Sequence, residues 1–76
     1  MKEMLEALVK GLVDFPDKVS VTEVPGDKFT TLELRVDPSD MGKIIGRQGR
    51  IIKSVRTLMK AYATKENKKL NVEIVE

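Results

Sequence analysis

Two glycines enclose a basic and a neutral polar residue in Gly46-Arg47-Gln48-Gly49, the pattern in this chain that is best suited to chemistry. A glycine has no side chain that would hold a ligand away, so the backbone amides of such a loop can approach an anion closely. Arg47 adds a planar guanidinium that stays charged, and Gln48 adds a hydrogen-bonding group that does not repel anions. These residue types favour contact with phosphate groups.

Positive charge is concentrated around this loop. The formal net charge is only +2, but residues 41–60 contain six basic residues and no acidic one, against eight basic and twelve acidic residues elsewhere. The segment therefore carries +6 and the rest of the chain −4. The six basic residues are Lys43, Arg47, Arg50, Lys53, Arg56 and Lys60. Such a segment attracts polyanions, although a row of Lys and Arg is also common on an ordinary solvated helix face.

The composition excludes several kinds of chemistry. The 76 residues include no Cys and no His, which removes disulfides, thiolate zinc sites, a Cys nucleophile and the commonest general base. The glycine spacing fits neither a dinucleotide-binding fingerprint nor the phosphate loop of nucleotide hydrolases. We therefore expect a non-enzymatic protein without a metal or another cofactor.

Apolar stretches in the chain are short. Charged residues interrupt the segment from Met1 to Phe15, unlike the core of a signal peptide, and no stretch approaches membrane-spanning length. These features predict a cytoplasmic protein with no membrane partner.

Residue periodicity predicts one domain over residues 1–76. Apolar residues at helical spacing mark three helices, and β-branched or alternating residues mark three strands. The predicted helices are 2–13, 41–45 and about 50–63, and the predicted strands are about 19–22, 30–36 and 70–75. Ser39 or Asp40 is the predicted cap of the short helix. The order α-β-β-α-α-β predicts an α+β fold in which helices pack on one face of a three-stranded mixed sheet.

The predicted helix over residues 50–63 separates apolar from charged side chains. At about 100° per residue, six apolar residues fall within one third of the circumference, opposite four basic ones. The apolar residues are Ile51, Ile52, Val55, Leu58, Met59 and Tyr62, and the basic ones are Arg50, Lys53, Arg56 and Lys60. We expect the first set in the core and the second at the surface.

The glycine loop between two helices, in this order of elements, resembles the KH domain of type II. The resemblance covers essentially the whole chain and is closest to small bacterial proteins that consist of a single KH domain. It implies a non-enzymatic protein that binds single-stranded RNA, such as a post-transcriptional regulator or an RNA chaperone. It also implies a homodimer, or a heterodimer with a larger KH-containing protein.

The resemblance also assigns roles to residues. The loop residues Gly46, Arg47, Gln48 and Gly49 would clamp the RNA backbone, Gly42 and Lys43 would form the approach to the loop, and Ile44 and Ile45 would form its apolar wall. Arg50 and Lys53, on the basic face of the next helix, are further candidates because of their charge. The polar connector 64–69 would bound the groove, which makes Lys65, Lys68 and Lys69 secondary candidates.

Two other classes of function fit parts of the pattern. A helix-turn-helix DNA reader would also have two helices joined by a turn, but a leading helix of about five residues is short for that motif. A protein-interaction module could use the same surface for assembly, in which case the phosphate chemistry of the loop would be incidental.

Overall fold

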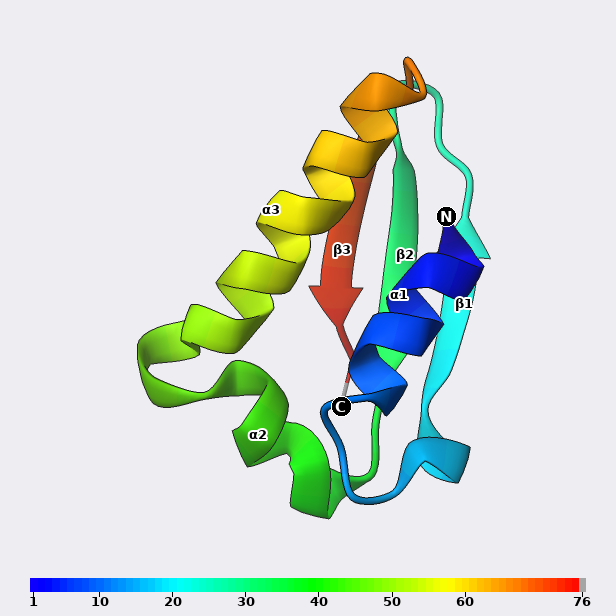
Figure 1. The fold of residues 1–76 in the computed structure, drawn as a ribbon. Coiled ribbons are helices and arrows are strands. Elements are labelled where there is room, and N and C mark those ends of the chain that lie inside the picture. Colours follow the sequence, from blue (N-terminus) through cyan, green and yellow to red (C-terminus); the bar gives the residue numbers. More distant parts are fainter. Residues whose placement is uncertain (76) are drawn as a thin grey trace.

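The computed structural model describes residues 1–75, with Arg47 described by its backbone alone. Its elements follow the predicted order α-β-β-α-α-β (Figure 1). The helices are α1 (Lys2–Lys10), α2 (Met41–Ile45) and α3 (Arg50–Lys65), and the strands are β1 (Ser20–Val24), β2 (Thr30–Arg35) and β3 (Leu70–Ile74). Short 3-10 turns, η1 (Pro16–Lys18), η2 (Pro38–Asp40) and η3 (Arg47–Gly49), lie between them.

The strands form one mixed sheet in the order β1-β2-β3. β1 runs antiparallel to β2 with Val21 opposite Leu34, and β3 runs parallel to β2 with Val72 opposite Leu32. A parallel neighbour needs a long crossover connection, and the segment containing α2 and α3 supplies it. All four of these side chains are buried, so one face of the sheet lines the core. The predicted fold class is confirmed.

The helices cover that face of the sheet (Figure 1). Leu5 and Val9, one helical turn apart on α1, are fully buried, and so is Ile44 of α2. The buried residues of α3 are Ile52, Val55, Met59 and Ala63. Their spacing of three or four residues gives α3 a single apolar stripe that faces the sheet.

The predicted apolar face of α3 was wrong at Leu58. Its side chain is 50% exposed, whereas Ala63, which we did not assign to that face, is 1% exposed. Leu58 lies about 100° around the helix from Met59, outside the stripe that meets the sheet. Ile51 and Tyr62 are only partly buried. The sequence pattern could not show where on the broad apolar arc the sheet would make contact.

Two helix ends differ from the prediction. α1 ends at Lys10 instead of residue 13, which leaves Leu12 44% exposed. Gly11 follows directly, and glycine has the lowest helix propensity apart from proline. α3 extends two residues beyond 63 and ends where Asn67 takes a φ of 61° and Lys68 N–H bonds to Ala63 C=O at 2.8 Å, a common C-terminal cap. Among residues 1–75, none of these helices is long and apolar enough to cross a lipid bilayer.

Candidate nucleic-acid interface

The glycine loop has an unusual backbone. Gly46 (φ 63°, ψ −167°) closes α2, and Gly49 (φ 71°, ψ 21°) precedes α3. Gln48 between them also has a positive φ of 56°, which is uncommon for a residue with a side chain. Conformations of this kind persist only where the surrounding structure imposes them, and they cluster at ligand sites. The Gln48 side chain is exposed, while that of Arg47 lies outside the described residues.

The two glycines are needed for different reasons. A Cβ added at Gly46 would lie 3.1 Å from Ile51 Cγ1, so Ile51 would have to shift, and the packing and the backbone angle both disfavour a side chain there. A Cβ at Gly49 would make only an ordinary contact of 3.8 Å with Ile52, so the positive φ alone favours glycine. At Gly42 a Cβ would meet nothing within 4 Å. The surface leading to the loop is therefore open.

The apolar pairs on either side of the loop do not share one role. Ile44 and Ile52 are 0% and 6% exposed and fix α2 and α3 to the core. Ile45 is 40% exposed and Ile51 is partly buried under Gly46. Of the predicted apolar wall, Ile45 is thus the side chain available to a ligand, and Ile44 is a core residue.

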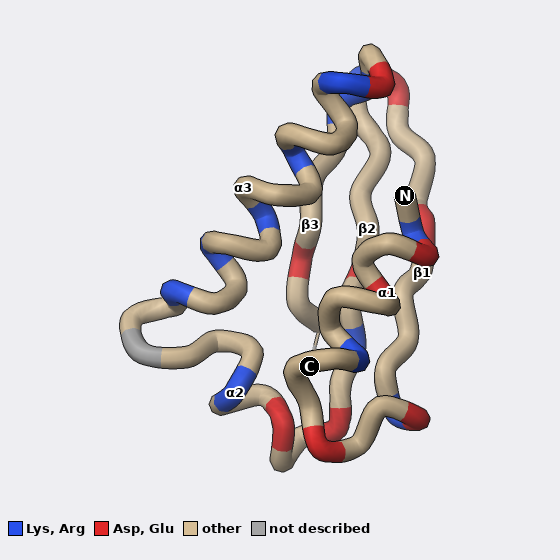
Figure 2. Tube along the Cα trace, viewed as in Figure 1, with Lys and Arg blue, Asp and Glu red and all other residues tan. Residues whose placement is uncertain are grey.

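Apart from Arg47 in η3, the predicted basic residues lie along α2 and α3 (Figure 2). Lys43, Arg50, Lys53 and Lys60 are exposed. Arg56 differs because it is partly buried and its Nε donates a hydrogen bond to the Val72 carbonyl of β3 at 2.9 Å. This contact joins the basic side of α3 to the outer edge of the sheet.

The three secondary lysines separate into two places. Lys68 and Lys69 share a hollow with Lys60, Thr64 and Leu70, between the end of α3 and the start of β3. Lys65 lines a different hollow with Met4, Leu58 and Tyr62, on the α1 side of α3. Lys68 and Lys69 therefore continue the basic side of α3, and Lys65 does not.

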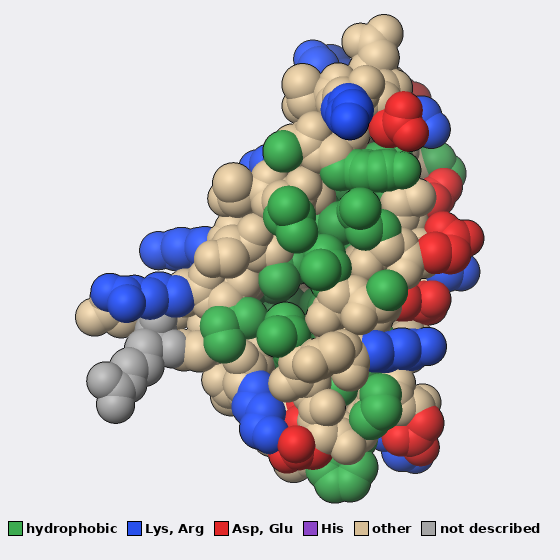
Figure 3. Space-filling model, viewed as in Figure 1, with side chains coloured by type: hydrophobic (Ala, Val, Ile, Leu, Met, Phe, Trp, Pro, Cys, Tyr) green, Lys and Arg blue, Asp and Glu red, His purple; other side chains and the backbone are tan. Residues whose placement is uncertain are grey.

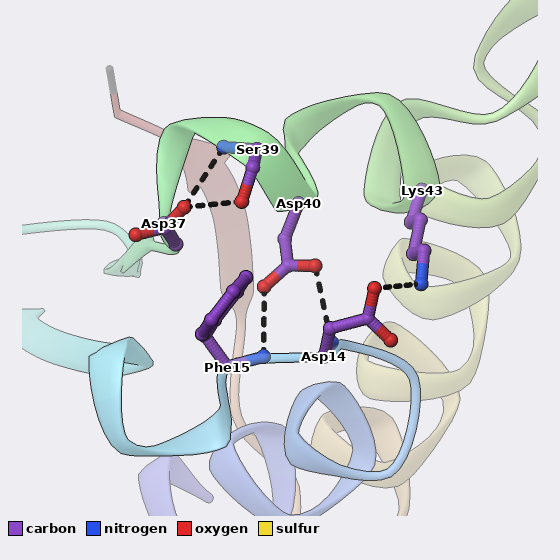
Figure 4. A network of polar contacts seen from close by, with 6 residues as sticks. All are labelled: Asp14, Phe15, Asp37, Ser39, Asp40 and Lys43. Carbon is purple, nitrogen blue, oxygen red and sulfur yellow. Dashed lines mark hydrogen bonds and ion pairs between the residues drawn. The ribbon is translucent and has the colours of Figure 1, made fainter.

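A polar network anchors the segment in front of α2 (Figure 4). Asp40 is fully buried, and its Oδ1 and Oδ2 accept hydrogen bonds from the backbone N–H groups of Asp14 (3.0 Å) and Phe15 (3.1 Å). The Asp14 carboxylate in turn forms an ion pair with Lys43. Asp37 accepts hydrogen bonds from the hydroxyl and backbone N–H of Ser39, and these lower the pKa of the Asp37 carboxyl.

The predicted helix cap is confirmed in position but not in its bonding. Asp40 is the N-cap residue of α2, yet its side chain makes no capping hydrogen bond, because it binds backbone groups 25 and 26 residues earlier in the chain. Sequence reasoning missed Asp14 altogether. An acidic residue beside Phe15-Pro16 carries no local signal of its distant basic partner, so only the fold reveals the pair.

The left-handed Gly-x-x-Gly loop between two helices, set on a β1-β2-β3 mixed sheet, is the architecture of a type II KH domain. The chain belongs to the family of KhpA/KhpB KH domains, whose model matches residues 2–74. This finding confirms the resemblance to small single-domain KH proteins.

Curated relatives cover nearly the whole chain. Proteins named RNA-binding protein KhpA from Clostridium acetobutylicum and Clostridium perfringens are each 57% identical over 75 residues, which is 99% of this chain and all of each relative. The protein of that name from Aquifex aeolicus is 47% identical over 76 residues, 100% of this chain and 96% of the relative. No solved structure matches the chain.

Proposed function

We propose that this protein binds single-stranded RNA without catalysis, by clamping the RNA backbone at residues 46–49. The observation that carries the proposal is the loop backbone, in which Gly46, Gln48 and Gly49 all have positive φ values beside a row of exposed cations. The absence of a Cβ at both ends lets phosphates reach the amides. The relatives' name, RNA-binding protein KhpA, supports the same ligand.

The surroundings of the loop support a path for the strand along α3 and β3. Lys53, Arg56 and Lys60 follow the loop on α3, and the hollow of Lys60, Lys68 and Lys69 continues the same side. Arg56, fixed by the Val72 carbonyl, keeps its Nη groups for a base or a phosphate. An RNA strand on this path would present the edges of its bases to the protein. The bases of an RNA duplex are paired and cannot do so. In the cell, this binding would serve post-transcriptional regulation or an RNA chaperone activity in the cytoplasm.

The test is fluorescence anisotropy with a labelled single-stranded RNA at two or more salt concentrations. We expect wild-type binding to weaken with salt, with a slope of log affinity near −2 if about three phosphates are neutralised, at about −0.7 for each. Arg47→Asp with Gln48→Asp should abolish binding while circular dichroism reports an unchanged fold. Duplex DNA should bind less well than the RNA.

A charge-matched control separates the loop from bulk charge. Lys28→Asp with Ser20→Asp makes the same change in net charge at exposed positions outside the loop and should retain most of the binding. If the loop variant binds RNA like the wild type, or if the wild type does not bind, the clamp is wrong. A loop variant that keeps its biological activity would instead favour an assembly module.

We also propose that a second copy of the chain binds the apolar surface on the α1 side of α3. Met4, Leu58, Ala61 and Tyr62 line a hollow there, and Met4 and Leu58 are 41% and 50% exposed. Apolar side chains gather on the face of the molecule between α1 and α3 (Figure 3). A two-fold axis near Leu58 and Ala61 would pair two α3 helices in antiparallel order, so that the same apolar side chains meet on both copies. A closed homodimer requires such a self-complementary surface.

A further inference from the structure

Lys43, a predicted RNA contact on the approach to the glycine loop, has an acidic partner within the chain. Its Nζ forms an ion pair with Asp14, 29 residues earlier in the sequence, and the two side chains are 48% and 65% exposed. Asp14 belongs to the connector between α1 and η1, which lies beside the start of α2 (Figure 4). The pair thus joins two segments that the fold brings together.

The position of Asp14 is set by a buried group. Both oxygens of Asp40, which is 0% exposed, accept hydrogen bonds from the backbone of Asp14 and Phe15. A buried carboxylate that satisfies two backbone donors is costly to disturb, so it fixes the backbone of this connector. The fixed backbone therefore keeps the Asp14 side chain within reach of Lys43.

The Asp14 carboxylate beside Lys43 is negatively charged, as is the RNA phosphate that Lys43 would contact in the proposed function. The Lys43 ammonium is a compact charge whose attraction for a phosphate is reduced while a carboxylate neutralises it. Because both side chains are exposed to solvent, a phosphate can reach Lys43. It must then compete with the Asp14 carboxylate for the charge of the Lys43 ammonium.

We propose that Asp14 is a built-in competitor of the RNA phosphate for Lys43, held in place by the buried Asp40. This inference rests on the proposed function, because it concerns the same site. Asp14 lowers the affinity of the protein for any single-stranded RNA, so that binding of the strand depends more on the clamp at residues 46–49. It acts on the approach to the loop and leaves the loop itself unchanged.

The test compares Asp14→Asn, Lys43→Met and the double variant with the wild type, using the same labelled RNA and salt series. Asp14→Asn should bind about two- to fivefold more tightly, the range expected for releasing one exposed ion pair. Its salt slope should become steeper by about 0.7, because Lys43 then contributes a full phosphate contact. In the Lys43→Met background, Asp14→Asn should have no effect.

Asp17→Asn is the control for charge alone, because Asp17 lies on the neighbouring turn η1 and is exposed. An equal gain with Asp17→Asn, or a gain from Asp14→Asn that survives in Lys43→Met, would mean that Asp14 acts only through net charge. Weaker binding by Asp14→Asn would show that the pair positions Lys43 for RNA, and unchanged binding would show that it has no role. Each of these results overturns the inference. If the Arg47→Asp, Gln48→Asp variant loses binding in the same assay, the proposed function stands in all of these cases.

Discussion

Gly46 and Gly49 have the same residue type and similar φ values, but the structure makes different demands on them. Gly46 combines a φ of 63° with a ψ of −167°, a region that is essentially closed to residues with a side chain. Gly49 has a φ of 71° and a ψ of 21°, which is left-handed helical and open to other residues at a moderate cost. The two glycines of the Gly-x-x-Gly pattern are therefore unequal in how strictly the structure requires glycine.

This inequality predicts unequal effects of alanine on stability. Gly46→Ala should cost about 3 kcal/mol, because the new Cβ adds overpacking against Ile51 to backbone strain. Gly49→Ala should cost about 1 kcal/mol, because only the left-handed backbone resists it. Urea denaturation of both variants measures the difference. Equal losses would contradict both the more restrictive backbone angles of Gly46 and its packing against Ile51.

At the scale of elements, α2 is too short to be stable alone. Isolated helices of fewer than about 12 residues are marginal in water, and α2 has five. Its position must come from contacts at both ends, namely Ile44 in the core and Asp40 bonded to the connector after α1. The glycine loop starts where α2 ends, so Asp40 also contributes to the geometry of the loop.

We therefore predict that Asp40→Asn destabilises the protein by about 2 kcal/mol. The amide NH₂ that replaces one oxygen would face a backbone N–H, and a buried donor would lose its acceptor. Hydrogen exchange at the Asp14 and Phe15 amides should accelerate first, before global unfolding. Asp17→Asn, at an exposed position, should stay within about 0.5 kcal/mol of the wild type. Unchanged exchange at both amides in Asp40→Asn would contradict this role.

For the whole molecule, the sequence predicted the features that depend on local patterns, but not the contacts between residues far apart in the chain. The element order, the mixed sheet and the loop between α2 and α3 all followed from period-two and helical spacing within short windows. The partners of Asp40 did not, because hydrogen bonds across 25 residues leave no local pattern. Leu58 was misplaced because a wide apolar arc does not reveal which part of it meets the sheet. Only the packing of α3 against the sheet shows that Leu58 is exposed.

The exposure of Leu58 leads to a prediction about assembly. If a second copy covers this surface, the wild type should sediment as a dimer at micromolar to millimolar concentrations. Leu58→Glu should sediment as a monomer, because a charge would be buried without a partner in the interface. Thr64→Glu adds the same charge on the β3 side of α3 and should remain a dimer. Both substitutions replace exposed side chains, so thermal unfolding should report folded variants. A wild type that is monomeric throughout this range, or a dimer that survives Leu58→Glu, would exclude this surface as a contact between two copies.

If the wild type is a dimer, it presents two clamps to one RNA strand, and the second clamp binds at a high effective concentration. Anisotropy with an RNA long enough for two loops should therefore show weaker binding by the Leu58→Glu monomer than by the wild type. Equal binding by both would mean that only one loop contacts the strand.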